Sequence, residues 1–228
     1  MSVKYRHEFK YIISDGELAI LRQRIENILQ KDSHLGDADR YNIRSLYFDD
    51  YYNRCLYENE NGTDPREKFR IRIYNHSSNV INLECKRKER GKTLKTSCSL
   101  TSDECERLVS GQYLRDIAEQ NTVKKKFTFE MMSRLLRPVI IVEYDRIPYV
   151  YKDGNVRVTF DTNLSSSVDI GGFLKGDVAK RPVMPAGQHL MEVKFDEFLP
   201  DFIYRALQID NLQQTAYSKY YLCRKYKL

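Results

Sequence analysis

The chain has 228 residues, of which 41% are hydrophobic and 31% are charged, and its formal net charge is +6. This composition supplies enough apolar side chains for a core, which excludes a disordered protein. The longest aliphatic run, residues 139–142, is far shorter than the ~20 residues that a membrane-spanning helix needs. We therefore expect a soluble protein with a single domain over residues 1–228, and its basic excess favours anionic partners.

The five cysteines form no CxxC pair and have no histidine at a zinc-ligand spacing. Their odd number argues against a disulfide framework. We expect reduced, mostly buried thiols in a cytoplasmic protein.

The first predicted element is a strand in RHEFKY, residues 6–11, where charged and aromatic side chains alternate strictly. In a strand, this alternation places the charges on one face and the aromatic groups on the other. A helix should follow, because Ser14 and Glu17 form a capping box ahead of leucines and isoleucines at helical spacing.

Further helices and strands follow along the chain. Thr101 and Glu104 repeat the capping signal, and a third helical stretch runs through residues 129–136 until Pro138 stops it. Strands are predicted in YNIRSLYF, KFRIRIY, VINLECKRK, TLKTSCSL, PVIIVEYDR, NVRVTF and HLMEVKF. About eight strands can close a barrel. We predict an α+β fold with a closed eight-stranded antiparallel β-barrel, helices packed on its outside, and a long loop over residues 163–187 at one mouth.

The alternation of the opening strand returns in later strands, where one face carries mainly arginine and lysine. The residues with this parity are Lys68, Arg70, Arg72, Asn82, Glu84, Lys86, Lys88, Arg157, Thr159, Asp161, Glu192 and Lys194. A sheet with one face in water would give the same alternation. The excess of like charges, and the need of the amphipathic helices for an apolar sheet face, favour charges that point inward. Such a cationic tunnel is tolerable only with water and a polyanion inside it.

The motifs RHEFKY, LYFDD, FRIRIY, LECKRK, YDR, VRVTFDTNL, MEVKF and SKY, taken together in this order, carry a resemblance to a known family. They resemble the polyphosphate polymerase (vacuolar transporter chaperone, VTC) domain of the triphosphate tunnel metalloenzyme, or CYTH-like, superfamily. The resemblance covers nearly the whole chain. It implies a closed eight-stranded tunnel that binds a triphosphate through basic residues and a divalent metal through glutamates.

The resemblance assigns phosphate binding to six basic residues: Lys10, Arg70, Arg72, Lys86, Arg146 and Arg157. Lys194 lies on the same strand face, and Lys219 in SKY matches a basic residue on a C-terminal helix near the tunnel. The shared parity and the basic strand motifs add Arg6, Lys68, Lys88 and Lys95 to the lining. Ala216 stands where family members often carry a lysine, which reduces the charge near one mouth and weakens the expectation of efficient chain elongation.

The expected cofactor is Mn²⁺ or Mg²⁺, because hard divalent ions prefer oxygen ligands and bridge phosphate oxygens. Glu192 matches the metal-binding glutamate of the family. Glu8 resembles a carboxylate of related tunnel phosphatases, and Glu84 is a further candidate, but both could instead pair with neighbouring cations. No catalytic role is assigned to the four histidines, His7, His34, His76 and His189, which show no metal-ligand spacing.

The resemblance implies an ATP:polyphosphate phosphotransferase that adds the γ-phosphate of ATP to a growing polyphosphate chain. The alternatives are an inorganic triphosphatase or nucleoside triphosphatase with the same tunnel, and a non-catalytic polyphosphate-binding module. Nucleic acid is disfavoured, because the aromatic residues alternate away from the charges instead of forming stacking platforms among them. Polymerase members are often coupled to membrane proteins, so the expected location is the cytoplasm or the inner face of a membrane.

Charge repulsion also gives an expectation for stability. If Arg70 and Arg72 lie in a crowded cationic tunnel, their removal should weaken triphosphate binding but leave the stability of the free protein unchanged or raised.

Overall fold

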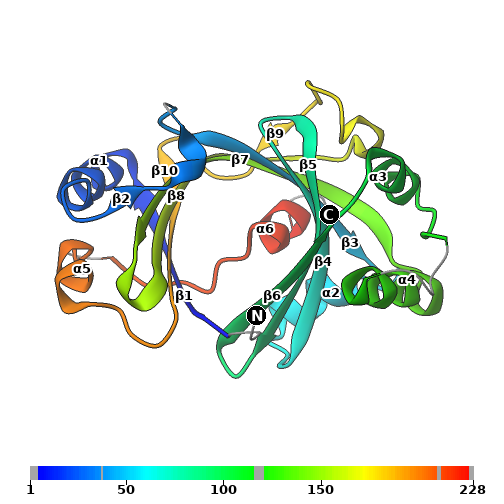
Figure 1. Ribbon diagram of the computed structural model, residues 1–228, viewed down its shortest axis with the longest axis horizontal. Coiled ribbons are helices and arrows are strands. Elements are labelled where there is room, and N and C mark those ends of the chain that lie inside the picture. Colours follow the sequence, from blue (N-terminus) through cyan, green and yellow to red (C-terminus); the bar gives the residue numbers. More distant parts are fainter. Residues whose placement is uncertain (1–4, 37, 116–120, 210–211, 226–228) are drawn as a thin grey trace.

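The computed structural model describes residues 5–36, 38–115, 121–209 and 212–225. A single antiparallel sheet curls around a central space, and most helices lie on its convex side (Figure 1). Its strands follow the order β1-β10-β8-β7-β3-β4-β5-β6, with β2 beside β7 and β9 beside β8. The strands are β1 (His7–Ser14), β2 (Gln30–Lys31), β3 (Tyr41–Asp49), β4 (Arg66–Tyr74), β5 (Ser77–Glu89), β6 (Lys92–Ser99), β7 (Arg137–Tyr151), β8 (Val156–Ser167), β9 (Arg181–Pro182) and β10 (Gln188–Phe195). The predicted α+β architecture is confirmed.

The two ends of this sheet nearly meet. Among the described residues, β1 and β6 are joined by one bridge, in which Arg6 and Thr93 exchange two backbone hydrogen bonds of 2.9 Å. Further along β1, at Tyr11, its free edge pairs with Gln214, and the Thr215 amide donates to the Lys10 carbonyl at 2.8 Å. The prediction of a closed barrel was therefore overstated, because the C-terminal segment pairs with the edge of β1 along this seam.

The helices cover the sheet from both sides. They are α1 (Asp15–Ile25), α2 (Arg54–Glu60), α3 (Ser102–Val109), α4 (Thr122–Arg134), α5 (Asp201–Ala206) and α6 (Lys219–Lys225). Helices α1 and α5 pack outside one part of the curl, α3 and α4 outside the other, and α6 lies within it (Figure 1). Tyr220 and Leu222 of α6 pack against inward-facing apolar residues such as Ile43 and Val142. The inner face is thus apolar at one end, and the prediction that the helices pack outside fails for α6.

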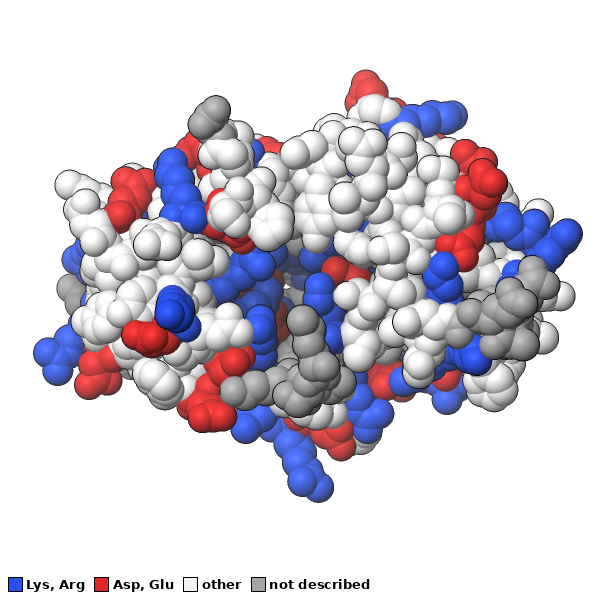
Figure 2. Space-filling model, in the orientation of Figure 1, with Lys and Arg blue, Asp and Glu red and all other residues white. Residues whose placement is uncertain are grey.

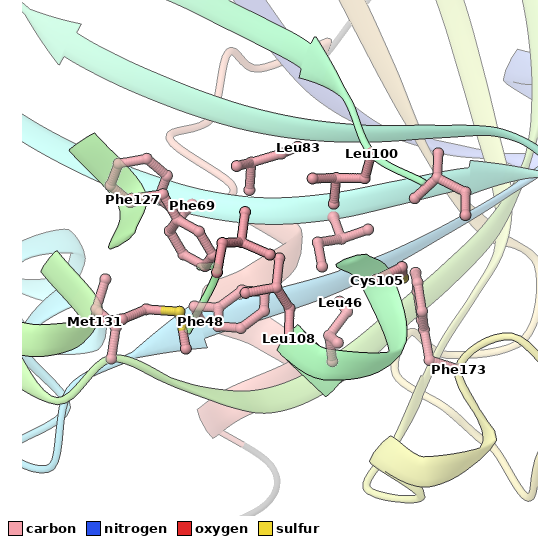
Figure 3. Close-up of a cluster of buried hydrophobic side chains, with 14 of the residues drawn as sticks. Leu46, Phe48, Phe69, Leu83, Leu100, Cys105, Leu108, Phe127, Met131 and Phe173 are labelled. Atoms are coloured by element: carbon pink, nitrogen blue, oxygen red, sulfur yellow. The ribbon is translucent and has the colours of Figure 1, made fainter. Parts of the chain in front are cut away.

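A large part of the core lies between the convex face of β3, β4 and β5 and the helices α3 and α4 (Figure 3). Phe69 of β4 and Leu83 of β5 point outward. They meet Leu108 of α3 and Phe127 of α4. The ring of Phe127 lies 4.8 Å from that of Phe48 and 5.0 Å from that of Phe69. Because the apolar side chains of these strands face outward, their charged neighbours face inward, as the alternation predicts.

Three predicted boundaries differ from the structure. The helix predicted through residue 136 ends at Arg134, and Pro138, predicted to stop it, lies in β7. Strand β8 continues to Ser167, so the segment predicted as a loop from residue 163 begins as a strand. Ser165, Ser166 and Ser167 pair with β7 across a β-bulge near Glu143. Pairing with the neighbouring strand outweighs the weak local strand propensity of serine. Helix α4 begins at Thr122, earlier than predicted, because the Asn121 side chain accepts a hydrogen bond of 2.8 Å from the Val123 amide.

All five cysteines are free, and Cys85, Cys105 and Cys223 are buried. No helix in the described ranges is long and apolar enough to cross a bilayer.

Replacing Phe127 with alanine should lower the free energy of unfolding by about 3–5 kcal/mol, because Phe127 is fully buried between two aromatic rings. Phe129→Ala, two residues further along the same helix, is the matched control. Its side chain is 66% exposed, so the change should stay within about 0.5 kcal/mol. Urea unfolding of both variants measures the difference, and similar losses would show that α4 does not pack as described.

Candidate functional site

A cavity of about 460 Å³ lies on the concave side of the sheet. Its lining contains ten basic residues, Lys10, Arg66, Lys68, Arg70, Arg72, Lys86, Lys88, Arg146, Lys194 and Lys219. Only two carboxylates, Glu8 and Glu192, join them among the described residues. In Figure 2, lysine and arginine gather around a central hollow of the molecule. The cavity therefore has the charge of a site for anions.

Strand register determines how these side chains meet. Along β4 and β5, residues directly opposite each other include Lys68 and Lys86, then Arg70 and Glu84. On the other side, Lys10 of β1 lies opposite Glu192 of β10. Because opposing positions on one face bring Cβ atoms to about 5 Å, the charges of each pair act on one another.

Glu84 holds the two arginines of FRIRIY. Arg70 donates to the Glu84 carboxylate from Nε and lies 2.7 Å from it through Nη2, while Arg72 Nη1 lies at 3.7 Å and Lys95 Nζ at 3.0 Å. Burial alone would raise the pKa of Glu84, but Arg72 and Arg70 hold it well below its ordinary value. The sequence left open whether Glu84 binds a metal or pairs with neighbouring cations. Its contacts are those of a pairing partner.

A second buried network joins α6 to the sheet. Arg146 binds Asp161 in a bidentate pair with two distances of 2.7 Å. Lys219 Nζ lies 2.6 Å from Asp161 and 2.6 Å from Glu192. Burial alone would lower the pKa of Lys219, but Asp161 and Glu192 raise it above its ordinary value. Lys219 is therefore a permanent cation held by two carboxylates.

Glu8 and Glu192 converge on one ammonium group. Lys194 Nζ lies 2.8 Å from Glu192 Oε2 and 3.5 Å from Glu8 Oε1, and Lys86 Nζ donates to Glu8 Oε2 at 2.7 Å. Burial would raise the pKa of Glu8, but Lys10, Lys86 and Lys194 lower it, so the carboxyl is ionised. Two carboxylates that share one cation form a donor set that a divalent ion could use. The described residues contain no cluster of three or more histidine, cysteine or acidic side chains suited to a metal. An ion at this place would therefore depend on these two carboxylates.

Crowding of the cations shifts lysine pKa values. Enclosure in the cavity lowers the pKa of Lys86 to about 7 against the opposing effect of Glu8, with Lys10 and Lys194 adding repulsion. Enclosure likewise lowers the pKa of Lys68 to about 7, and Arg66 and Lys86 contribute. Lys86 still keeps 30% of its side chain exposed toward the cavity. Both lysines are therefore poised to take up a proton when an anion arrives.

Three predicted lining residues lie outside the cavity wall. Arg6 pairs with Asp196 at 3.1 Å beside the seam. Arg157 pairs with Asp32 instead of facing the cavity. Lys95 forms an ion pair with Glu84, and half of its side chain is exposed. Shared parity placed them on the right face, but it could not show which of them bind a nearby carboxylate.

The structure adds residues that the sequence did not single out. Arg66 belongs to the lining, and so do Tyr47 and Tyr144. The Tyr144 hydroxyl lies 3.5 Å from both Arg72 and Arg146, and the Tyr47 hydroxyl accepts from Arg70 at 2.7 Å. Arg66 shares the parity of Lys68 and could have been found by it, whereas the tyrosines stand on strand faces that are apolar in sequence.

The position of Ala216 and the histidines completes the comparison with the sequence. Ala216 lines the cavity, so a lysine there would add a further charge. His7 stacks on Phe195 with ring centroids 5.0 Å apart. His34, His76 and His189 lie beside Asp32, Glu143 and Asp15, respectively.

The model of the VTC domain matches residues 5–227. The chain belongs to the VTC domain family. No functionally curated protein matches this VTC domain in sequence. The family match and the curled antiparallel sheet agree with the resemblance seen in the motifs.

Solved structures share the fold of this VTC domain at low sequence identity. A Hippeastrum protein proposed to be an adenylyl cyclase, HpAC1, with a dominant triphosphatase activity, has a TM-score of 0.54 and 11% identity over 99% of this chain and 97% of its own. A Bacillus halodurans protein proposed to be an adenylate cyclase has a TM-score of 0.51 and 15% identity over 91% of this chain and 88% of its own. The PH1819 protein of Pyrococcus horikoshii has a TM-score of 0.50 and 14% identity over 97% of this chain and 99% of its own. The VTC domain thus shares the fold of these three proteins.

The lowered pKa values of Lys68 and Lys86 predict a pH dependence of stability. Between about pH 7 and pH 10 the unfolded chain binds more protons than the folded one, so these two lysines should make the free energy of unfolding rise with pH over that window. Below about pH 7 their destabilising effect should be constant. Urea unfolding of the wild type and of Lys68→Met, a change that removes no carboxylate's ion-pair partner, measures this at several pH values. The variant should be the more stable protein near pH 7, and its advantage should shrink as the pH rises; a constant difference would contradict the prediction.

The Glu84 network reverses the expectation that the loss of Arg70 and Arg72 leaves the free protein equally stable. Arg70→Ala/Arg72→Ala would leave a carboxylate that is only 1% exposed with Lys95 as its remaining ion-pair partner. Removing the partner of a buried charge costs about 3–5 kcal/mol, so the free protein should lose stability by about that amount. Adding Glu84→Gln to the double variant should recover part of the loss. Unfolding measurements that show no loss in the double variant would exclude this network as a stabilising element.

Proposed function

We propose that this VTC domain is a polyphosphate polymerase, which transfers the γ-phosphoryl group of ATP to the end of a polyphosphate chain and releases ADP. The observation that carries the proposal is the excess of ten basic residues over two glutamates around one cavity, in a chain of this family. Phosphoryl transfer requires little covalent chemistry from a protein, because positioning and charge neutralisation supply most of the catalysis. A cationic cavity suits that reaction, which needs no nucleophilic side chain.

Each group of residues has a distinct role in the proposal. Arg70, Arg72 and Arg146 present planar guanidinium groups that can bind phosphate oxygens, and their carboxylate and hydroxyl partners fix their orientation. Lys10 and Lys86 add point charges to the same cavity. Because the arginines are held before the substrate arrives, binding requires little rearrangement of the cavity.

Glu192 and Glu8 would hold Mn²⁺ or Mg²⁺. Both glutamates contact Lys194, Glu8 also binds Lys86, and Glu192 also binds Lys219. A divalent ion at this place would therefore compete with these lysine ammonium groups. When bound, such an ion neutralises phosphate charge and orients the reacting oxygens. Ions of this kind are commonly held by one or two carboxylates together with substrate phosphates, which is the donor set available here.

A second candidate function keeps the cavity and replaces the acceptor with water, giving a triphosphatase. Two observations favour it. Ala216 leaves the lining without one further lysine, and the Hippeastrum protein of the same fold is described by its dominant triphosphatase activity. The polymerase is preferred because the family match covers residues 5–227, whereas the likeness to the Hippeastrum protein concerns the fold.

In this proposed reaction, ATP and polyphosphate bind inside the cavity, and a partner protein receives the product. On the family resemblance, that partner is a membrane protein at the cytoplasmic side of a membrane, and nucleic acid is not a ligand.

Incubating the protein with ATP and Mn²⁺ distinguishes the candidates, because long-chain polyphosphate indicates the polymerase and free phosphate indicates the triphosphatase. Glu192→Gln should lower either activity by about a hundredfold or more and weaken Mn²⁺ binding, measured by electron paramagnetic resonance. Glu106→Gln, on the exposed outer side of α3, is the control and should change neither. Unfolding curves verify that the Glu192 variant is folded, since Lys219 loses one of its two carboxylates. If wild type forms neither product, both candidate functions are wrong.

A further inference from the structure

A separate cavity, of about 740 Å³, lies where strand β8 changes its neighbour. Residues 157–161 of β8 pair with β10, whereas Ser165 and Ser166 pair with β9. Between these two ladders, Asn163 adopts a left-handed backbone conformation with a φ of 55°, beside the β-bulge in the pairing with β7. Bulges redirect side chains and are common next to functional sites. The cavity is bounded by this part of β8 and by residues 184–188, which lead into β10.

Four polar side chains form one row across the sheet at this cavity. Asn42 of β3 lies directly opposite Asp145 of β7, and Asp145 lies opposite Thr162 of β8. His189 of β10 completes the row, since it and Thr162 each lie two residues beyond a directly opposed, outward-facing apolar pair of the same two strands. Neighbouring strands are ~4.8 Å apart, so the row spans roughly 14 Å. It therefore offers a line of contacts to an elongated ligand.

Three of these four side chains carry a buried polar atom without a hydrogen-bond partner among the described residues. The three atoms are Asn42 Oδ1, Thr162 Oγ1 and His189 Nδ1. Thr162 is only 5% exposed and His189 only 9%. Asn42 and His189 use their other nitrogen on Asp145 and Asp15, at 3.1 and 2.7 Å, so neither can turn its free atom to the same partner. Buried polar atoms are nearly always hydrogen-bonded, and three free ones in a single row indicate a site for a polar ligand.

The free atoms call for hydrogen-bond donors on the ligand. Asn42 Oδ1 can only accept, and His189 Nδ1 accepts when Nε2 donates its proton to Asp15. The Asp145 carboxylate accepts from the amides of Asn42 and Asn163 at 3.1 and 2.8 Å, but within the described ranges it has no ion-pair partner. A ligand that satisfies the row must therefore bring both donors and positive charge.

The charges around the row also favour a cation. Glu143, which lines the cavity, is bound by Arg44 and Lys180, so these two cations are already occupied. Asp145 stands near one end of the row, and Asp15, with 76% of its side chain exposed, lies beyond His189 at the other end. Three carboxylates thus face two cations here, although the whole chain has a net charge of +6. This local excess attracts positive groups to both ends of the row.

We propose that the row formed by Asn42, Asp145, Thr162 and His189 binds a linear polyamine. Its ammonium groups, separated by three or four methylene groups, supply charged donors at intervals close to one strand spacing of ~4.8 Å. Met184 and the two residues after it provide apolar surface for the methylene segments.

A metal ion does not fit the whole row. Divalent ions bind oxygen ligands at about 2.0–2.6 Å, whereas Asp145 and His189 are two strand spacings, or about 10 Å, apart. The proposal is independent of the proposed enzymatic function, because in the described part of the chain this cavity and the basic one have no lining residue in common.

Calorimetric titration of the protein with spermidine, in the absence of ATP and polyphosphate, tests the proposal. Wild type should bind one spermidine per chain. Asp145→Asn should weaken binding by about tenfold or more, because one charge-assisted contact is lost. Asp153→Asn, at an exposed position on the η3 turn, removes the same charge outside the cavity and should leave the affinity unchanged. Putrescine, which can span one strand spacing but not two, should bind at least about fivefold more weakly than spermidine.

Thr162→Val separates the ligand site from a structural role of the hydroxyl. The change removes a buried group without a partner, so the urea midpoint of unfolding should stay the same or rise, while the affinity for spermidine should fall about threefold. A loss of stability would show that the hydroxyl has a partner within the protein and would remove it from the proposed row.

The remaining outcomes overturn the proposal. If wild type binds no spermidine, or if Asp145→Asn and Asp153→Asn lower the affinity equally, the row is not a polyamine site. Equal affinities for putrescine and spermidine would show that a single carboxylate binds the ligand without the rest of the row. Binding of Ca²⁺ that depends on Asp145, without binding of spermidine, would replace the polyamine with a metal ion.

Discussion

Repulsion among cations inside the curled sheet is the constraint on which the rest of the structure depends. Ten basic side chains face one cavity, and such a concentration of like charge opposes folding unless carboxylates or a ligand compensate it. Glu84, Asp161, Glu192 and Glu8 provide that compensation from within, each bound to two or more cations. Their side chains are at most 9% exposed. The charge that they leave uncompensated is available to an anion.

The position of α6 follows from the same constraint. Lys219 lies between Asp161 and Glu192, and the Tyr220 hydroxyl donates to the buried Asp49. The segment before the helix pairs with the free edge of β1, so the chain crosses the seam of the sheet and α6 lies inside the curl (Figure 1). Apolar packing against Ile43 holds the helix at one end of the interior. The enclosed part of the cavity thus has a wall that closes one side and contributes a cation to the site.

The sequence predicts the fold class and most strands because the alternation of charged and apolar residues directly encodes which face is inside. The same parity located Lys10, Arg70, Arg72, Lys86 and Glu192 around the cavity. It could not locate α6 inside the curl, because an amphipathic segment packs on whichever apolar surface is free. Nor could it separate Arg157, which binds Asp32, from Arg146, which lines the cavity and binds Asp161. These distinctions depend on contacts between residues far apart in the sequence, and they also reverse the stability expected after removal of Arg70 and Arg72.

The most direct measurement of the central claim, that this cavity is a site for a triphosphate and its metal, is a crystal structure of the protein grown with tripolyphosphate and Mn²⁺. Phosphate density should lie within the cavity, in contact with Arg70, Arg72 and Lys86, and the anomalous signal of manganese should lie beside Glu192. Phosphate density on the outer surface with water alone in the cavity, or manganese bound away from Glu192 and Glu8, would contradict the claim.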